Sequence, residues 1–116
     1  MYKKPIKKRI AVLGSTGSIG TQALDVINNN PDKFEIEVLT AQRNAGLLIE
    51  QASRFKPKHI VITDRQKYDK VKNALSSLPA KVYAGEDSLN KVVNLKSVDM
   101  VLTAIVGFAG LFPTIS

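Results

Sequence analysis

The most informative part of this sequence is residues 9–27, RIAVLGSTGSIGTQALDVI. It opens with Ile10–Leu13, a short apolar run typical of a strand that is buried on both faces of a parallel sheet. After Ile19, apolar residues recur at helical spacing, at Ala23, Leu24 and Ile27. The stretch therefore predicts a strand, a tight turn and a helix in succession.

Three glycines, Gly14, Gly17 and Gly20, fill the turn at three-residue intervals. Strand-to-helix turns also use glycine for steric reasons, so a glycine triad by itself is weak evidence. Here the turn joins the first strand to the first helix, where a Rossmann-type fold holds a pyrophosphate. Glycine lets a phosphate approach the backbone N–H groups at the positive end of the helix. No Gly-Lys-Ser/Thr follows, which excludes a P-loop, and the pattern predicts a dinucleotide site.

Gln42, Arg43 and Asn44 occupy a second diagnostic position, at the end of the next expected strand, Glu35–Ala41. NAD sites offer an acidic residue there to the ribose 2′-hydroxyl, whereas NADP sites need a cation for the 2′-phosphate. The guanidinium of Arg43 can bind a phosphate, and Asn44 can cap the next helix and donate to the same oxygens. A solvated arginine beside an ordinary capping asparagine is the alternative, but the position favours NADP over NAD.

The remainder of the chain alternates helices with strands. We expect helices over residues 45–55, 63–78 and 85–95, the second opened by a capping box at residues 63–66, and strands over residues 59–63, 81–84 and 98–103. Such alternation predicts an α/β fold, Rossmann-like and doubly wound, with a mainly parallel sheet of about five strands and helices on both faces.

Composition and charge narrow the class of protein. The 116 residues include no cysteine, which excludes disulfides and thiolate metal sites and fits a reducing cytoplasm. Much of the net charge of +7 comes from five cations in the first nine residues, and no aromatic pattern accompanies them, so nucleic acid is not an expected partner. The apolar run before Gly14 is too short for a signal peptide, and no run reaches membrane-spanning length. We expect one soluble, cytoplasmic domain.

The last segment is residues 104–116, AIVGFAGLFPTIS. Because strand ends border the ligand crevice of an open parallel sheet, Ala104, Ile105 and Val106 could pack against a flat ring. A glycine-containing turn into a core helix is an equal alternative. Pro113 suits the first turn of a helix that the chain leaves unfinished, so we expect a truncated domain. Apolar surface over residues 101–112 would then be exposed and cause self-association or domain swapping.

Together these motifs resemble the amino-terminal NADPH-binding domain of the 1-deoxy-D-xylulose 5-phosphate reductoisomerase family. The resemblance covers nearly the whole chain, through GSTGSIG at 14–20, LDV at 24–26, NP at 30–31, AxRN at 41–44, AIVGxAGL at 104–111 and PT at 113–114. It implies an NADP-dependent oxidoreductase that isomerises and reduces a ketose phosphate, 1-deoxy-D-xylulose 5-phosphate, to 2-C-methyl-D-erythritol 4-phosphate in non-mevalonate isoprenoid biosynthesis. It also implies NADPH and a divalent cation, Mg or Mn, as cofactors, and a homodimer for the full-length protein.

The same resemblance assigns roles residue by residue. The pyrophosphate would lie on Gly14, Thr16, Gly17, Ser18 and Ile19, the 2′-phosphate on Gln42, Arg43 and Asn44, and the nicotinamide near Ala104, Ile105 and Val106. Gln42 departs from the family's Gly or Ala, with little consequence if its contact is through the backbone. The family's metal-binding acids and substrate contacts lie beyond residue 116. Residues 1–116 are therefore expected to form an NADPH-binding domain that has no catalytic or metal-binding residue and turns nothing over.

Three other polar residues are not expected to be catalytic or metal-binding, and three other classes of protein share the glycine loop or its binding function. His59, Asp25 and Asp99 are interpreted as structural or surface residues, because no partner is spaced for metal binding or acid–base chemistry. Aspartate-semialdehyde dehydrogenases and extended short-chain reductases also use Gly-x-x-Gly-x-x-Gly loops, and residues 104–107 argue against both. A non-catalytic dinucleotide sensor is an alternative of a different class.

Overall fold

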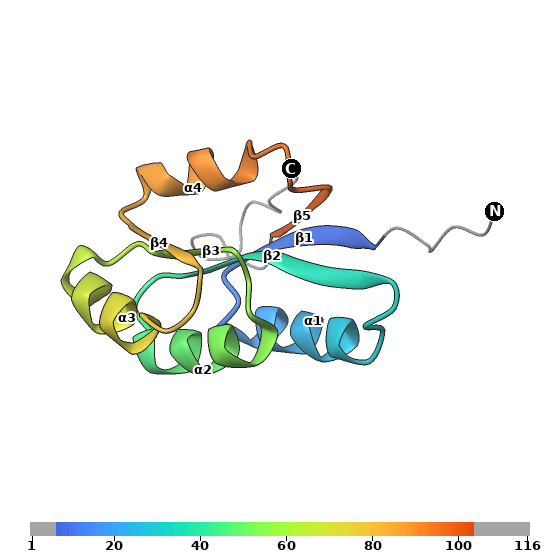
Figure 1. Cartoon of the computed structure of the whole chain (residues 1–116), viewed down its shortest axis with the longest axis horizontal. Coiled ribbons are helices and arrows are strands. Elements are labelled where there is room, and N and C mark those ends of the chain that lie inside the picture. Colours follow the sequence, from blue (N-terminus) through green and yellow to red (C-terminus); the bar gives the residue numbers. More distant parts are fainter. Residues whose placement is uncertain (1–6, 104–116) are drawn as a thin grey trace.

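The computed structural model describes residues 7–103, which form one parallel sheet covered by helices (Figure 1). Its strands are β1 (Lys8–Leu13), β2 (Phe34–Ala41), β3 (His59–Ile62), β4 (Lys81–Ala84) and β5 (Met100–Thr103). They lie in the order β4-β3-β2-β1-β5, and every neighbouring pair is parallel. The predicted five-stranded parallel sheet is confirmed.

Helices cover both faces of this sheet, as the alternation of elements predicted. The helices α1 (Ser18–Asn28), α2 (Ala45–Phe55) and α3 (Tyr68–Ala74) lie on one face, and α4 (Asp87–Val93) lies on the other (Figure 1). The fold is therefore doubly wound. Of the helices in residues 7–103, none combines the length and the apolar character that crossing a bilayer requires.

The strand β1 contributes to two hydrophobic cores, one on each face of the sheet. Ile10 and Val12 pack with the apolar residues of α1, α2 and α3, whereas Ala11 packs with Val92 of α4. Successive side chains of a strand point to opposite faces, and both faces are covered here, so every second residue cannot be polar. This is why Ile10–Leu13 is apolar throughout.

The chain reverses its direction of travel across the sheet at β1. From β1 it proceeds outward through β2, β3 and β4, and then returns to the other side of β1 as β5. In an open parallel sheet, ligands bind outside the carboxyl ends of the strands at such a switch point. The register places Thr103 of β5 opposite Leu13 of β1, so both strands end at this position.

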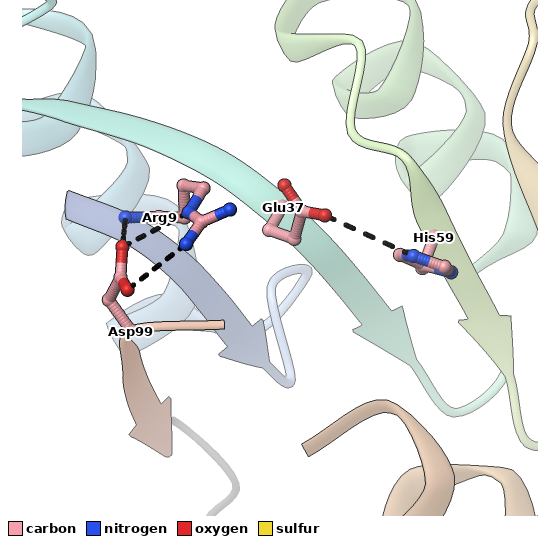
Figure 2. A network of polar contacts seen from close by, with 4 residues as sticks. All are labelled: Arg9, Glu37, His59 and Asp99. Carbon is pink, nitrogen blue, oxygen red and sulfur yellow. Dashed lines mark hydrogen bonds and ion pairs between the residues drawn. The ribbon is translucent and has the colours of Figure 1, made fainter. Parts of the chain in front are cut away.

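A β-bulge interrupts the pairing of β1 with β2. Ile10 lies opposite Ile36, whereas Ala11 lies opposite Val38, so Glu37 is the extra residue of β2. The side chain of Glu37 is only 2% exposed. Its carboxylate points toward His59 at the start of β3, with Oε2 4.0 Å from Nε2 (Figure 2).

His59 joins three neighbouring strands. Besides approaching Glu37 of β2, its Nδ1 lies 3.0 Å from the hydroxyl oxygen of Tyr83 in β4. Burial lowers the pKa of His59; the charge of Glu37 opposes this effect, and Lys81 and Lys58 reinforce it. These contacts agree with the structural role expected of this histidine.

Asp99 fixes the entry of the chain into β5. Its Oδ2 accepts hydrogen bonds from the backbone N–H of Arg9 at 2.8 Å and from the Nε of the same residue at 3.2 Å (Figure 2). The hydrogen bonds and positive charge of Arg9 lower the pKa of Asp99. Asp99 is thus a strand-entry residue, as expected, and Asp25 is exposed on α1. At the following strand, Met100 and Val101 are 44% and 38% exposed, while the self-association expected from this edge stays a prediction.

The elements α3, α4 and β5 begin later than expected. Asp64, rather than Thr63, accepts the capping bond from the N–H of Gln66 at 3.0 Å, and a short 3-10 turn, Arg65–Lys67, precedes α3, which ends at Ala74 instead of residue 78. The helix α4 begins at Asp87 instead of residue 85 because Gly85 has a φ of 93°, which a right-handed helix does not admit. The strand β5 begins at Met100, two residues after the predicted start, since Asp99 is occupied by Arg9.

Candidate dinucleotide-binding site

The glycine loop follows β1 at the carboxyl edge of the sheet, and its three glycines meet different steric conditions. Gly14 has a φ of 79°, in the left-handed region that favours glycine. A methyl group on Gly20 would collide with the carbonyl oxygen of Gly14 and lie 2.7 Å from Cα of Ser15, because α1 packs directly on the loop. Gly17 is exposed, and a methyl group there would find its nearest neighbour at an ordinary 3.7 Å. The conformation of the loop therefore requires glycine at positions 14 and 20, whereas neither the backbone angles nor the packing requires it at position 17.

The helix α1 begins without a side-chain cap. Its N-cap is Gly17, and its first turn holds no acidic residue. The second helix differs, because Asn44 Oδ1 accepts a hydrogen bond from the N–H of Leu47 at 3.2 Å. Around the start of α1, Thr16 is half-buried and Ser18 and Ile19 are exposed. Backbone N–H groups and the positive end of the helix dipole are thus presented together, an arrangement that binds anions.

Buried hydrogen bonds tie the inner side of the loop to β2 and α2. Thr40 accepts the N–H of Gly14 at its side-chain oxygen, at 3.0 Å, and the N–H of Ser15 at its carbonyl, at 2.8 Å. Ser15 Oγ donates to Gln51 Oε1 at 2.7 Å, and Gln51 Nε2 donates to the carbonyl of Ser15 at 2.9 Å. Reasoning from sequence missed Gln51, because 36 residues separate it from Ser15 and no local pattern links them.

Arg43 and Asn44 lie after β2, at the same edge of the sheet. Both are exposed, and the carbonyl of Gln42 accepts the N–H of Asp64 at 2.9 Å, which fixes the backbone at this point. A cleft of about 400 Å³ lies outside the ends of β2, β3 and β4 and is lined by Gln42, Arg43, Thr63, Asp64, Gln66 and Glu86. The carboxylates of Asp64 and Glu86 were not among the predicted site residues.

The structure therefore brings two of the three predicted groups of site residues to one edge of the sheet. The loop residues Gly14, Thr16, Gly17, Ser18 and Ile19 follow β1, and Gln42, Arg43 and Asn44 follow the neighbouring β2. The third group, Ala104, Ile105 and Val106, lies outside the described residues. Within residues 7–103, no three His, Cys, Asp or Glu side chains are grouped so as to hold a metal ion.

The parallel sheet, its helices on both faces and the glycine loop at its carboxyl edge define an α/β domain of the Rossmann class. Residues 10–116 match the family model described as 1-deoxy-D-xylulose 5-phosphate reductoisomerase. The chain belongs to this family. Membership sets aside the aspartate-semialdehyde dehydrogenases and the short-chain reductases as alternatives.

Relatives with the same name are similar over nearly the whole chain. The 1-deoxy-D-xylulose 5-phosphate reductoisomerase of Bacteroides thetaiotaomicron is 57% identical over 98% of the chain, and that of Phocaeicola vulgatus is 54% identical over 96%. The match covers 29% of each relative, so the chain spans less than a third of their length.

Solved structures show the same fold. The Zymomonas mobilis reductoisomerase in complex with NADPH is 38% identical, with a TM-score of 0.82 over 91% of this chain and 28% of that one. A reductoisomerase in complex with NADPH, fosmidomycin and magnesium is 31% identical, with a TM-score of 0.82 over 90% of this chain and 26% of that one.

Proposed function

We propose that residues 1–116 form the NADPH-binding domain of an enzyme that isomerises and reduces 1-deoxy-D-xylulose 5-phosphate to 2-C-methyl-D-erythritol 4-phosphate. The observation that carries the proposal is the uncapped start of α1 behind the glycine loop, with Arg43 at the end of the adjacent strand. Family membership supports the reaction, and the NADPH named with the solved relatives supports the cofactor.

In this proposal the two ends of the site divide the binding of the cofactor's phosphates. The pyrophosphate lies on the backbone N–H groups of Thr16 to Ile19, where an anion is stabilised without a side-chain cation. The guanidinium of Arg43 donates to the 2′-phosphate, and Asn44, whose Oδ1 already accepts the N–H of Leu47, has its amide N–H groups left to donate. The adenosine occupies the cleft beyond Arg43.

The third group of residues serves the reacting end of the cofactor. In the proposal, Ala104, Ile105 and Val106 lie near the nicotinamide. Support comes from Thr103, the residue before them, because it ends β5 opposite the last residue of β1, from which the glycine loop starts. NADPH supplies the hydride, and the residues of this chain bind and orient it. A divalent cation does not fit the described part of the chain, because no cluster of its ligands is present there. In the whole protein the metal and the substrate are held by residues outside this chain.

The proposal extends to properties of the whole protein that follow from its family resemblance. These are a place in non-mevalonate isoprenoid biosynthesis, a cytoplasmic location and a homodimer. Conversion of 1-deoxy-D-xylulose 5-phosphate with matching consumption of NADPH, by the full polypeptide that carries this sequence, tests the activity. NADPH binding without conversion would instead favour a dinucleotide sensor.

The cofactor preference has its own test. The full polypeptide is titrated with NADPH and NADH, and we expect NADPH to bind about 10- to 100-fold more tightly because charge-assisted hydrogen bonds reach the 2′-phosphate. Arg43→Ala should lower the affinity for NADPH to that for NADH. Arg54→Ala is the matched control, since Arg54 lies exposed at the far end of α2, over the ring of Phe55. Equal affinities in the unaltered protein would contradict the assignment of Arg43.

A further inference from the structure

We infer that Gln51 is a positioning residue that aims the N–H of Thr16 at the pyrophosphate of a bound dinucleotide. The inference rests on the proposed function and deepens it, because it gives one buried side chain of α2 a role in a site that it does not touch. Gln51 is 7% exposed and Ser15 is fully buried, so their contacts are shielded from solvent.

Both ends of the Gln51 amide are engaged by a single residue of the loop. Its Oε1 accepts from Ser15 Oγ at 2.7 Å, and its Nε2 donates to the carbonyl oxygen of Ser15 at 2.9 Å. Two such bonds in opposite directions leave the amide one orientation. They also leave the Ser15 carbonyl one direction, toward α2.

The direction of that carbonyl determines where the next N–H points. The peptide bond between Ser15 and Thr16 is planar and trans, so its N–H is directed opposite to its C=O. With the carbonyl held inward by Gln51, the N–H of Thr16 is directed away from α2. Within residues 7–103 this N–H donates to no protein acceptor, whereas those of Gly14, Ser15 and Gly17 all do.

The neighbouring peptides show why the hydrogen bond from Gln51 to the Ser15 carbonyl matters more than the other bonds of the loop. The N–H groups of Gly14 and Ser15 are fixed by Thr40, and that of Gly17 by the carbonyl of Gly14 at 3.3 Å. No bond in the described part of the chain other than that from Gln51 holds the Ser15 carbonyl. Without Gln51, the peptide could rotate and turn its oxygen, rather than its N–H, toward the ligand.

The variant Gln51→Met keeps the length of the side chain and removes both hydrogen bonds. Its affinity is measured for NADPH and for adenosine 2′-phosphate, which carries the 2′-phosphate but no pyrophosphate. In the full polypeptide we expect the affinity for NADPH to fall about 10-fold and that for adenosine 2′-phosphate to change less than about twofold. Gln22→Met, the same change at an exposed position of α1, should leave both affinities unchanged.

A second variant, Gln51→Glu, keeps the inference testable if Gln51→Met does not fold. A protonated carboxyl can accept from Ser15 Oγ and donate to the Ser15 carbonyl, as the amide does, whereas a carboxylate repels that carbonyl. The ratio of NADPH affinity to adenosine 2′-phosphate affinity, relative to the unaltered protein, should therefore recover as pH falls.

Three results would overturn the inference. These are equal losses for both ligands in Gln51→Met, no loss for either ligand, or a Gln51→Glu ratio that does not depend on pH. Failure of the unaltered full polypeptide to bind NADPH is a different result, because it overturns the proposed function and this inference with it.

Discussion

Replacing Gly17 and Gly20 separately with alanine should divide binding from folding within one loop. The two positions are three residues apart and both belong to the glycine triad, but the structure gives them opposite surroundings. A methyl group on Gly20 would press on backbone atoms of Gly14 and Ser15, at 2.7 Å and 2.8 Å from Cα and C of Ser15. Backbone atoms cannot move aside as a flexible side chain can, so α1 would have to shift away from the loop.

The expected losses of stability follow from these surroundings. Overpacking typically costs about 1–3 kcal/mol, and contact with backbone places Gly20→Ala at the upper end. The better helix propensity of alanine returns about 1 kcal/mol, which leaves a net loss of about 2 kcal/mol. Gly17 has an ordinary φ of −79° and its added methyl meets nothing closer than 3.7 Å. Gly17→Ala should therefore lower the free energy of unfolding by less than about 1 kcal/mol, which reflects only the poorer capping by alanine.

The order is reversed for the cofactor. The added methyl of Gly17→Ala lies at the exposed start of α1, where the proposed pyrophosphate approaches the backbone. A phosphate that is held about 1 Å further away loses its hydrogen bonds, so we expect NADPH affinity to fall at least about 10-fold, or about 1.4 kcal/mol. Affinity for adenosine 2′-phosphate should be unchanged in this variant.

Urea denaturation and NADPH titration of the same preparations check both halves of the prediction. Gly20→Ala should unfold at a urea concentration lower by about 1 M, given the usual dependence of stability on urea. Gly17→Ala should unfold within about 0.5 M urea of the unaltered protein but bind NADPH weakly. The reasoning is refuted if Gly17→Ala binds NADPH normally, or if Gly20→Ala is as stable as the unaltered protein.

The remaining predictions concern the pH dependence of stability at His59 and the cap of α2 at Asn44. Burial lowers the pKa of His59 below its ordinary value of about 6.5, so the unfolded chain binds a proton at a higher pH than the folded protein does. Stability should therefore decrease as pH falls from about 6.5 toward the pKa of the folded protein. His59→Gln should flatten this part of a plot of urea midpoint against pH, and an unchanged slope would count against the assignment. Asn44→Ala removes the cap of α2 and should lower the free energy of unfolding by about 1 kcal/mol. Asn44→Asp should retain the cap and still weaken NADPH binding, because the added carboxylate repels the 2′-phosphate. Normal NADPH affinity in Asn44→Asp would show that Asn44 does not belong to the site.

Most of the fold could be predicted because its signals are local. A continuous apolar run such as Ile10–Leu13 indicates a strand covered on both faces, and each helix shows its own apolar spacing. The bulge at Glu37 could not be predicted, since it depends on how β2 pairs with β1 and leaves no mark in either strand alone. The 3-10 turn at Arg65–Lys67 was missed because Asp64 and Thr63 are both good capping residues, and the backbone decides between them.

The candidate site was predictable in its positions but not in its internal division of roles. The sequence presents Gly14, Gly17 and Gly20 as equivalents, and only the packing of α1 on the loop separates them. Arg43 and Asn44 could be predicted as site residues because a strand end is a local feature. Gln51 could not be found, because its role depends on α2 lying beside a loop 36 residues away.

The charges along this edge of the sheet favour one direction for the proposed cofactor. At the glycine loop, α1 offers N–H groups and has no acid in its first turn. At the other end, the cleft is lined by the carboxylates of Asp64 and Glu86, with Arg43 beside them. A dinucleotide reversed end for end would keep its central pyrophosphate on the N–H groups of α1, but its 2′-phosphate would move away from Arg43, which would then have no anion to bind. The 2′-phosphate is attracted by Arg43 and repelled by Asp64 and Glu86, whereas the adenine amino group can donate to a carboxylate. The orientation with the 2′-phosphate on Arg43 and the adenine toward the two carboxylates therefore gives each charged group of the cleft a suitable partner.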